Sequence, residues 1–129
     1  MKKKILPLVL SAALVFCAGT LLGQEKDLSG IWEGTTYVPD SGDDQVTLTL
    51  KKEGETYSGT VTDTMGMAIE SKLENVQFKD GALKAEFLIF NGSDYVRINL
   101  ALKVSGEMLV GNWTDPGGET GTLELKRKD

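Results

Sequence analysis

Histidine is absent from this sequence of 129 residues, and cysteine occurs once, at Cys17. Without histidine the chain lacks the usual general base of neutral pH, the Ser-His and Cys-His nucleophile pairs and most zinc sites. A single cysteine also forms no disulfide within the chain. We therefore expect a protein that is held together by burial and hydrogen bonding, that is not an enzyme, and that uses no metal or cofactor.

Positive charge is also scarce, with 14 Lys and Arg against 19 Asp and Glu and a formal net charge of −5. Three of the basic residues lie at positions 2–4, so from Gln24 onward 11 basic residues stand against 19 acidic ones, a formal charge of −8. Nucleic-acid-binding proteins normally carry a basic face, and anionic membrane surfaces repel acidic chains. We expect neither as a partner.

A single long apolar run, Ile5 to Phe16, directly follows the three lysines. It is shorter than the roughly 20 apolar residues that a membrane-spanning helix needs. A basic start followed by a short apolar run predicts a secretory signal over residues 1–23 and a periplasmic or secreted protein. Cleavage near Gly19 or Gly23 would release a soluble chain.

Cys17 offers a second interpretation of the same segment. It directly follows the apolar run and precedes Ala18 and Gly19, which resembles a bacterial lipoprotein acceptor. The lipoprotein motif has a small residue just before its cysteine, whereas this chain has Phe16. Lipidation at Cys17 would anchor the protein to the envelope, and only then would we expect membrane contact.

Residues 24–129 are predicted to form one domain, in which apolar and polar residues alternate and turn residues recur every ten or so positions. No stretch of these residues has a helical pattern long enough for a crossover connection. The pattern predicts eight strands, and hence an all-β, eight-stranded antiparallel up-and-down meander barrel, with a two-sheet β-sandwich as the alternative. The expected strands cover residues 30–38, 45–51, 57–62, 69–79, 82–90, 95–104, 108–114 and 119–128. In the fourth of these, alternation breaks between Leu73 and Val76, which predicts a bulge around Glu74-Asn75.

An internal repeat supports closure of the barrel. Residues 48–66 and 100–118 carry the same residue at nine positions, at a constant offset of 52. Each copy contains a hairpin and its outgoing loop, so we expect two four-stranded halves related by internal duplication. The repeated glycines, Gly59 and Gly111, either allow the strands to coil and leave room for tryptophans, or mark places where a ligand approaches the wall.

Gly30-Ile31-Trp32 resembles the Gly-X-Trp signature of the calycin superfamily, which includes lipocalins and avidins. In that superfamily the tryptophan packs across the closed end of the barrel against a basic residue from the last strand. The resemblance implies that Trp32 and Arg127 close this barrel. The chain is also similar to short exported bacterial domains that begin Ser-Gly-X-Trp-X-Gly, which implies an extracytoplasmic location but no shared activity.

Carboxylates are the remaining candidates for chemistry. Asp63 and Asp115 stand at equivalent strand exits, where they form an acid/base pair or, more simply, cap the following turns. Asp40, Asp43 and Asp44 either offer oxygens to calcium or belong to a solvated loop.

Binding of a small hydrophobic molecule is the function that we predict, in or at the mouth of the barrel. The residues expected to contact it are Tyr57, Met65, Met67 and Trp113, because flexible methionines suit an adaptable lip. Alternatively, the segment from Met65 to Ala68, called the methionine loop below, folds over Leu88 and Phe90. The alternative function is an envelope structural or protein-interaction module with a filled barrel and no ligand.

Overall fold

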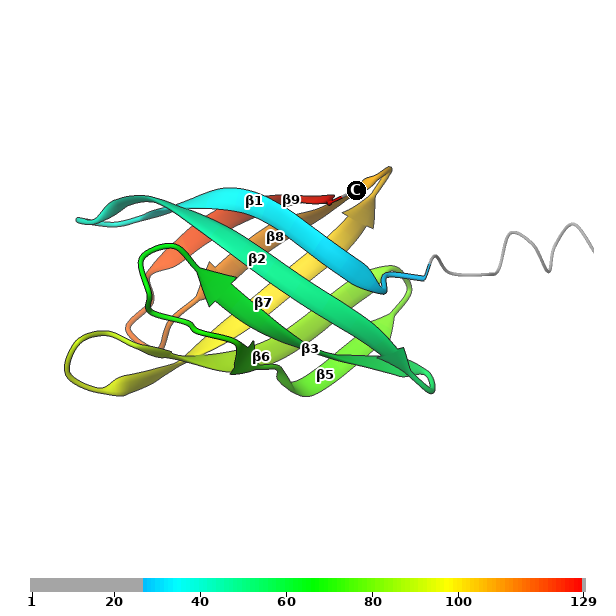
Figure 1. The fold of residues 1–129 in the computed structure, drawn as a ribbon, viewed down its shortest axis with the longest axis horizontal. Helices are drawn as coiled ribbons and strands as arrows, with labels where there is room; N and C mark the ends of the chain where they lie inside the picture. Colours follow the sequence, from blue (N-terminus) through cyan, green and yellow to red (C-terminus); the bar gives the residue numbers. More distant parts are fainter. Residues whose placement is uncertain (1–26, 129) are drawn as a thin grey trace, which may run out of the picture.

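The computed structural model describes residues 27–128, so the predictions for the signal segment and Cys17 lie outside the described residues. These residues form a nearly closed, barrel-shaped antiparallel sheet in the order β4-β3-β2-β1-β9-β8-β7-β6-β5 (Figure 1). The predicted all-β meander barrel is confirmed. Its strands are β1 (Gly30–Val38), β2 (Gly42–Glu53), β3 (Thr56–Asp63), β4 (Ser71–Lys72), β5 (Glu74–Lys79), β6 (Ala82–Phe90), β7 (Tyr95–Ser105), β8 (Met108–Thr114) and β9 (Thr120–Arg127).

The described residues form nine strands rather than eight because the segment expected to be one strand, 69–79, is divided. Its first part, β4, pairs with β3, and its second part, β5, pairs with β6. Between them the Leu73 N–H donates to the Gly59 carbonyl at 2.9 Å. A bulge follows, where Asn75 has a φ of 51° and the β5 register shifts. The predicted bulge is thus the bend that carries one strand from one edge of the sheet to the other.

The two copies of the repeat form hairpins of the same register. Leu50 faces Gly59 across β2 and β3, and Leu102 faces Gly111 across β7 and β8. A Cβ at Gly59 would lie 2.0 Å from the Thr49 carbonyl oxygen, and one at Gly111 would lie 1.9 Å from that of Ala101. The repeated glycines therefore allow adjacent strands to approach closely and coil, and neither lines the main cavity.

The barrel has a closed end and an open end. The N-terminal residues 27–29 and the turns after β2, β5 and β7 gather at the closed end, on the right of Figure 1. Leu28, Leu83 and Leu109, which lie at or next to this end, have no exposed surface, so the core is tightly packed at the closed end. The connections after β1, β3, β6 and β8 form the other end. Residues 27–128 contain no helix of the length and apolarity needed to cross a membrane.

Replacing Gly111 by alanine should lower the free energy of unfolding by about 1–3 kcal/mol, because the new methyl group would press on the Ala101 carbonyl in a packed wall. Urea denaturation measures the change. The matched control is Gly117→Ala in the turn before β9, where the nearest atom to a new Cβ is 3.5 Å away. It should change stability by less than about 0.5 kcal/mol. Equal effects of the two substitutions would contradict this account of the glycine.

Candidate functional site

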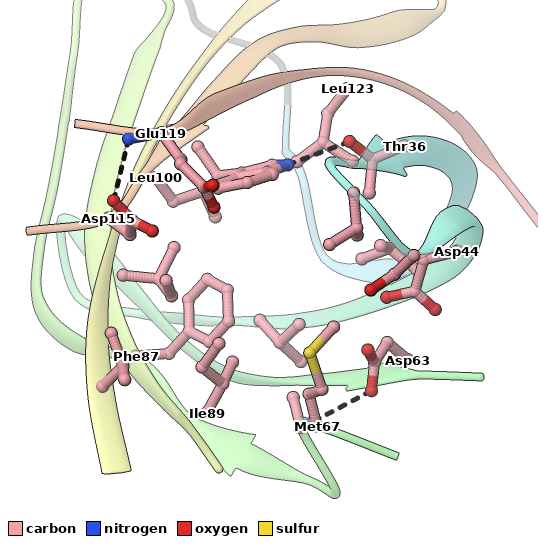
Figure 2. A pocket seen from close by; sticks show the side chains of 18 of the residues that line it. Thr36, Asp44, Asp63, Met67, Phe87, Ile89, Leu100, Asp115, Glu119 and Leu123 are labelled. Atoms are coloured by element: carbon pink, nitrogen blue, oxygen red, sulfur yellow. Dashed lines mark hydrogen bonds between the residues drawn. The ribbon is translucent and has the colours of Figure 1, made fainter. Parts of the chain in front are cut away.

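A cavity of about 330 Å³ opens between the connections that follow β1, β3, β6 and β8 (Figure 2). Its floor and walls are apolar side chains that project inward from the strands. Its polar groups belong mainly to strand ends and turns at the open end. The apolar lining consists of Val38, Pro39, Val46, Leu48, Val61, Met67, Ala68, Phe87, Ile89, Val96, Ile98, Leu100, Trp113, Leu123 and Leu125.

Trp113 forms one wall of the cavity. Its indole Nε1 donates to the Thr36 hydroxyl at 2.9 Å, and Thr36 is itself only 5% exposed. Gly121 faces Trp113 across β8 and β9, and a Cβ at Gly121 would lie 2.5 Å from the indole Nε1. The absence of a side chain at Gly121 therefore lets the indole lie flat against β9.

Four carboxylates line the cavity near its mouth. Asp44 and Asp63 lie on one side, and Asp115 and Glu119 lie across from them (Figure 2). Among residues 27–128, no lysine or arginine lines this cavity. The ionisable side chains at the mouth of this apolar pocket are therefore all acidic.

Asp44 is the buried member of this group, with 2% of its surface exposed. Its Oδ1 accepts hydrogen bonds from the Thr64 hydroxyl and the Met65 N–H, each at 3.1 Å. Asp44 thereby holds the loop that follows β3. Its carboxyl group also shares a hydrogen bond with that of Asp63.

The solvated-loop interpretation was wrong for Asp44, because β2 begins at Gly42 and turns this side chain inward. Asp43, next to it, is exposed on the opposite face. The residues from 27 to 128 contain no group of three acidic side chains placed to hold a metal ion. The signal for Asp44 was present in the sequence: it shares the parity of Val46 and stands 52 positions before the buried-face residue Val96.

Burial raises the pKa of Asp44 to about 6, and the hydrogen bond and negative charge of Asp63 raise it as well. The hydrogen bonds from the Met65 N–H and the Thr64 hydroxyl act in the opposite direction, because they favour the ionised form. A carboxylic acid with this pKa is largely protonated in mildly acidic solution and largely ionised above neutrality.

Asp63 and Asp115 cap turns, as the simpler of the two sequence interpretations expected. Asp63 Oδ1 accepts from the Ala68 N–H and Asp115 Oδ1 from the Glu119 N–H, both at 2.9 Å. The carboxyl group that meets Asp63 is that of Asp44. The geometry therefore does not bring Asp63 and Asp115 together as an acid/base pair.

Two of the four expected ligand contacts, Met67 and Trp113, line the cavity. Met65 lies on the same loop, 36% exposed, and is not part of the lining. Tyr57 is at the closed end, where its hydroxyl accepts from the Leu28 N–H at 2.9 Å and its ring meets Phe78 edge-on at 5.4 Å. The placement of Tyr57 in a ligand site is therefore corrected: inward parity predicted burial but not which end of the barrel it occupies.

The methionine loop lies along the end of β6. The Phe90 N–H donates to the Met67 carbonyl at 2.8 Å, and the Ser71 hydroxyl donates to the Leu88 carbonyl at 2.6 Å. Phe90 nevertheless remains 42% exposed and packs against Tyr95, with ring centroids 5.1 Å apart. The loop thus both lines the cavity and covers part of β6.

Trp32 and Arg127 meet at the closed end. The Arg127 guanidinium carbon lies 4.5 Å from the Trp32 ring centroid, and the indole Nε1 donates to the Leu28 carbonyl at 2.9 Å. Arg127 also donates to the carbonyls of Asp27, at 3.0 Å, and Ser29. These contacts tie the segment before β1 across the end of the barrel.

Comparison with known protein families, with curated proteins and with solved structures finds no match to this chain. The function must therefore be argued from the cavity and its charges.

Replacing Arg127 by alanine should reduce the free energy of unfolding by about 1–2 kcal/mol, because stacking on Trp32 and the hydrogen bonds to two carbonyls are lost. Guanidinium denaturation, followed by tryptophan fluorescence, measures the loss. Lys126→Ala removes the same charge from the outer face one position earlier and should cost less than about 0.5 kcal/mol. If both variants behave alike, the stacked arginine does not hold this end.

The raised pKa of Asp44 makes this group lower the stability of the fold as pH rises. The folded state holds the proton up to about pH 6, whereas the unfolded chain releases it near its ordinary value of about 3.9. The stabilising contribution is thus complete below the unfolded pKa and is lost as pH rises through the folded pKa. Asp44→Asn should therefore be more stable than wild type at pH 7.5, with the difference shrinking toward pH 4.5.

Thermal unfolding of both proteins across this pH range tests the prediction. Asp43→Asn changes the net charge equally on the exposed face, so its difference from wild type should show no such pH dependence. A gap between Asp44→Asn and wild type that does not change with pH would contradict the expected titration.

Proposed function

We propose that this protein is a non-enzymatic, exported carrier or receptor that binds a small hydrophobic molecule in the open end of its barrel. The cavity carries the proposal. Its volume of about 330 Å³ is many times the 10–15 Å³ that one water needs and falls at the lower end of the range of small-molecule sites. A barrel filled by its own side chains would have no such space.

The composition of the cavity supports the same conclusion. Its deep walls are aliphatic and aromatic, while hydrogen-bonding groups such as Thr36 and Asn91 stand at or near the strand ends. Ligand sites typically combine these features, since apolar walls provide affinity and a few polar groups set orientation. Arg127 stacks on Trp32 at the other end, and this contact supports a calycin-like barrel. The sequence resemblance to the calycins rests on Gly30-Ile31-Trp32.

A second candidate is an envelope protein that works through its outer surface. It is favoured by exposed apolar side chains near the open end: Ile69, Phe90 and Tyr95 are 74%, 42% and 72% exposed. Such a protein would need no ligand in its barrel.

A neutral apolar fluorophore, N-phenylnaphthylamine, tests the first proposal directly. We expect one molecule to bind per chain, with quenching or energy transfer from Trp113 in the cavity wall. Val96→Phe should weaken binding at least about tenfold, or about 1.4 kcal/mol, by filling the cavity. The control Val110→Phe places the same bulk on a half-buried position of β8 outside the cavity and should bind as wild type does.

Failure of the fluorophore to bind, or equal binding by both variants, would contradict the proposal and favour the surface-interaction candidate. Circular dichroism of each variant shows whether the barrel is intact, so that a lost fold is not read as a filled cavity.

A further inference from the structure

We propose that the ligand of this cavity is an amphiphilic amine, whose apolar body lies among the deep aliphatic walls and whose ammonium group lies between the carboxyl groups of Asp44 and Asp63. This inference rests on the proposed function and adds the chemical class of the ligand. The charges of the cavity, the position of Asp44 and the interaction between the Asp44 and Asp63 carboxyl groups support it.

Charge at the cavity has a single sign. Its lining includes Asp44 from β2, Asp63 from β3, and Asp115 and Glu119 from the connection between β8 and β9, with no lysine or arginine. These four residues are part of a formal charge of −8 that the chain carries from Gln24 onward. A carboxylate-bearing ligand such as a fatty acid would bring another negative charge into this field, whereas a cation would be attracted.

The pairing of the strands does not require a carboxyl group at the position of Asp44, although Asp44 also holds the loop after β3. When the offset of 52 is extended to the four residues before each copy of the repeat, the residue that corresponds to Asp44 is Val96, which faces the same cavity from the start of β7. The two hairpins nevertheless have the same register. A buried acid in one copy and an apolar residue in the other therefore points to a role that the two halves do not share.

The carboxyl groups of Asp44 and Asp63 lack a counter-charge from the cavity lining when both are ionised. At low pH the Asp44 carboxyl holds a proton and shares a hydrogen bond with Asp63. Its Oδ1 already accepts from the Thr64 hydroxyl and the Met65 N–H, so these contacts do not depend on that proton. Once the proton leaves, two negative groups face each other with no cation from the lining. An ammonium group replaces the proton, since it brings one positive charge and three donors.

The position of the pair also matches an amphiphile. Asp44 and Asp63 lie beside Met67 at the mouth, with Phe87 and Ile89 further along the same wall (Figure 2). A ligand whose charged group remains at the pair can therefore extend its hydrocarbon part along these side chains. An alcohol of the same length would make the apolar contacts but would leave the pair without a counter-charge.

Displacement of N-phenylnaphthylamine by octylamine, octanol and octanoate at pH 7.5 tests the inference, because the three molecules share one chain and differ in the head group. We expect octylamine to bind at least tenfold more tightly than octanol, and octanoate to bind most weakly. The preference for amine over alcohol should fall several-fold at pH 5, where Asp44 is protonated and the amine stays charged. Asp44→Asn should abolish the preference at pH 7.5, whereas Asp43→Asn, outside the cavity, should retain the preference and bind the fluorophore as wild type does.

The outcomes separate the two proposals. If the fluorophore binds but octylamine and octanol compete equally, or octanoate competes best, the amine inference is overturned while the hydrophobic site stands. If Asp43→Asn loses the preference as fully as Asp44→Asn does, the preference reflects net charge and the placement at the pair is wrong. If the fluorophore itself does not bind, the proposed function fails first.

Discussion

Among the described residues, β1 and β9 are the one strand pair that joins distant parts of the chain; every other pair in the sheet links sequence neighbours. The ladder there is short, with Trp32 opposite Arg127 and Glu33 opposite Lys126. Beside it the strands approach so closely that a Cβ at Gly34 would lie 2.1 Å from the Glu124 carbonyl oxygen. Because this junction joins the two halves of the barrel, the enclosed space between them depends on it.

Most of the fold was readable from local patterns. Alternating apolar residues, turn signals such as Asn91-Gly92 and the repeat at an offset of 52 predicted a duplicated antiparallel barrel, and the shared register of Leu50 with Gly59 and Leu102 with Gly111 matches that duplication. The division of segment 69–79 into two strands was predicted only in part. Sequence indicated a bulge there, but which neighbour each half pairs with is set by tertiary contacts such as Leu73 to Gly59.

The candidate site was less predictable, for a physical reason. The alternation of apolar and polar residues tells which side chains point inward, and it correctly predicted that Trp113 does. Turn chemistry at the strand exits predicted the capping roles of Asp63 and Asp115. The alternation does not tell at which end of the barrel an inward residue lies, so Tyr57 was misplaced. Asp44 was assigned to a calcium site or a solvated loop because a run of Asp, Ser and Gly resembles a loop, although β2 already begins at Gly42. The meeting of Asp44 and Asp63 depends on strand register, which composition does not reveal.

Two hairpins of equal register in one chain also affect how the chain reaches its fold. Backbone hydrogen bonding alone does not distinguish β2 from β7 as the partner of β3, because the two hairpins have the same register. Leucine pairs with glycine at the same place in each of them. Proximity along the chain favours the correct hairpin, because a short turn closes at lower entropic cost than a long loop. When two copies of the protein meet at high concentration, this advantage is smaller. A domain swap, in which the copies exchange hairpins, would form the same backbone hydrogen bonds. A buried carboxyl group at Asp44, where the other copy has Val96, gives the two otherwise similar strands different requirements for burial and so helps to keep them apart.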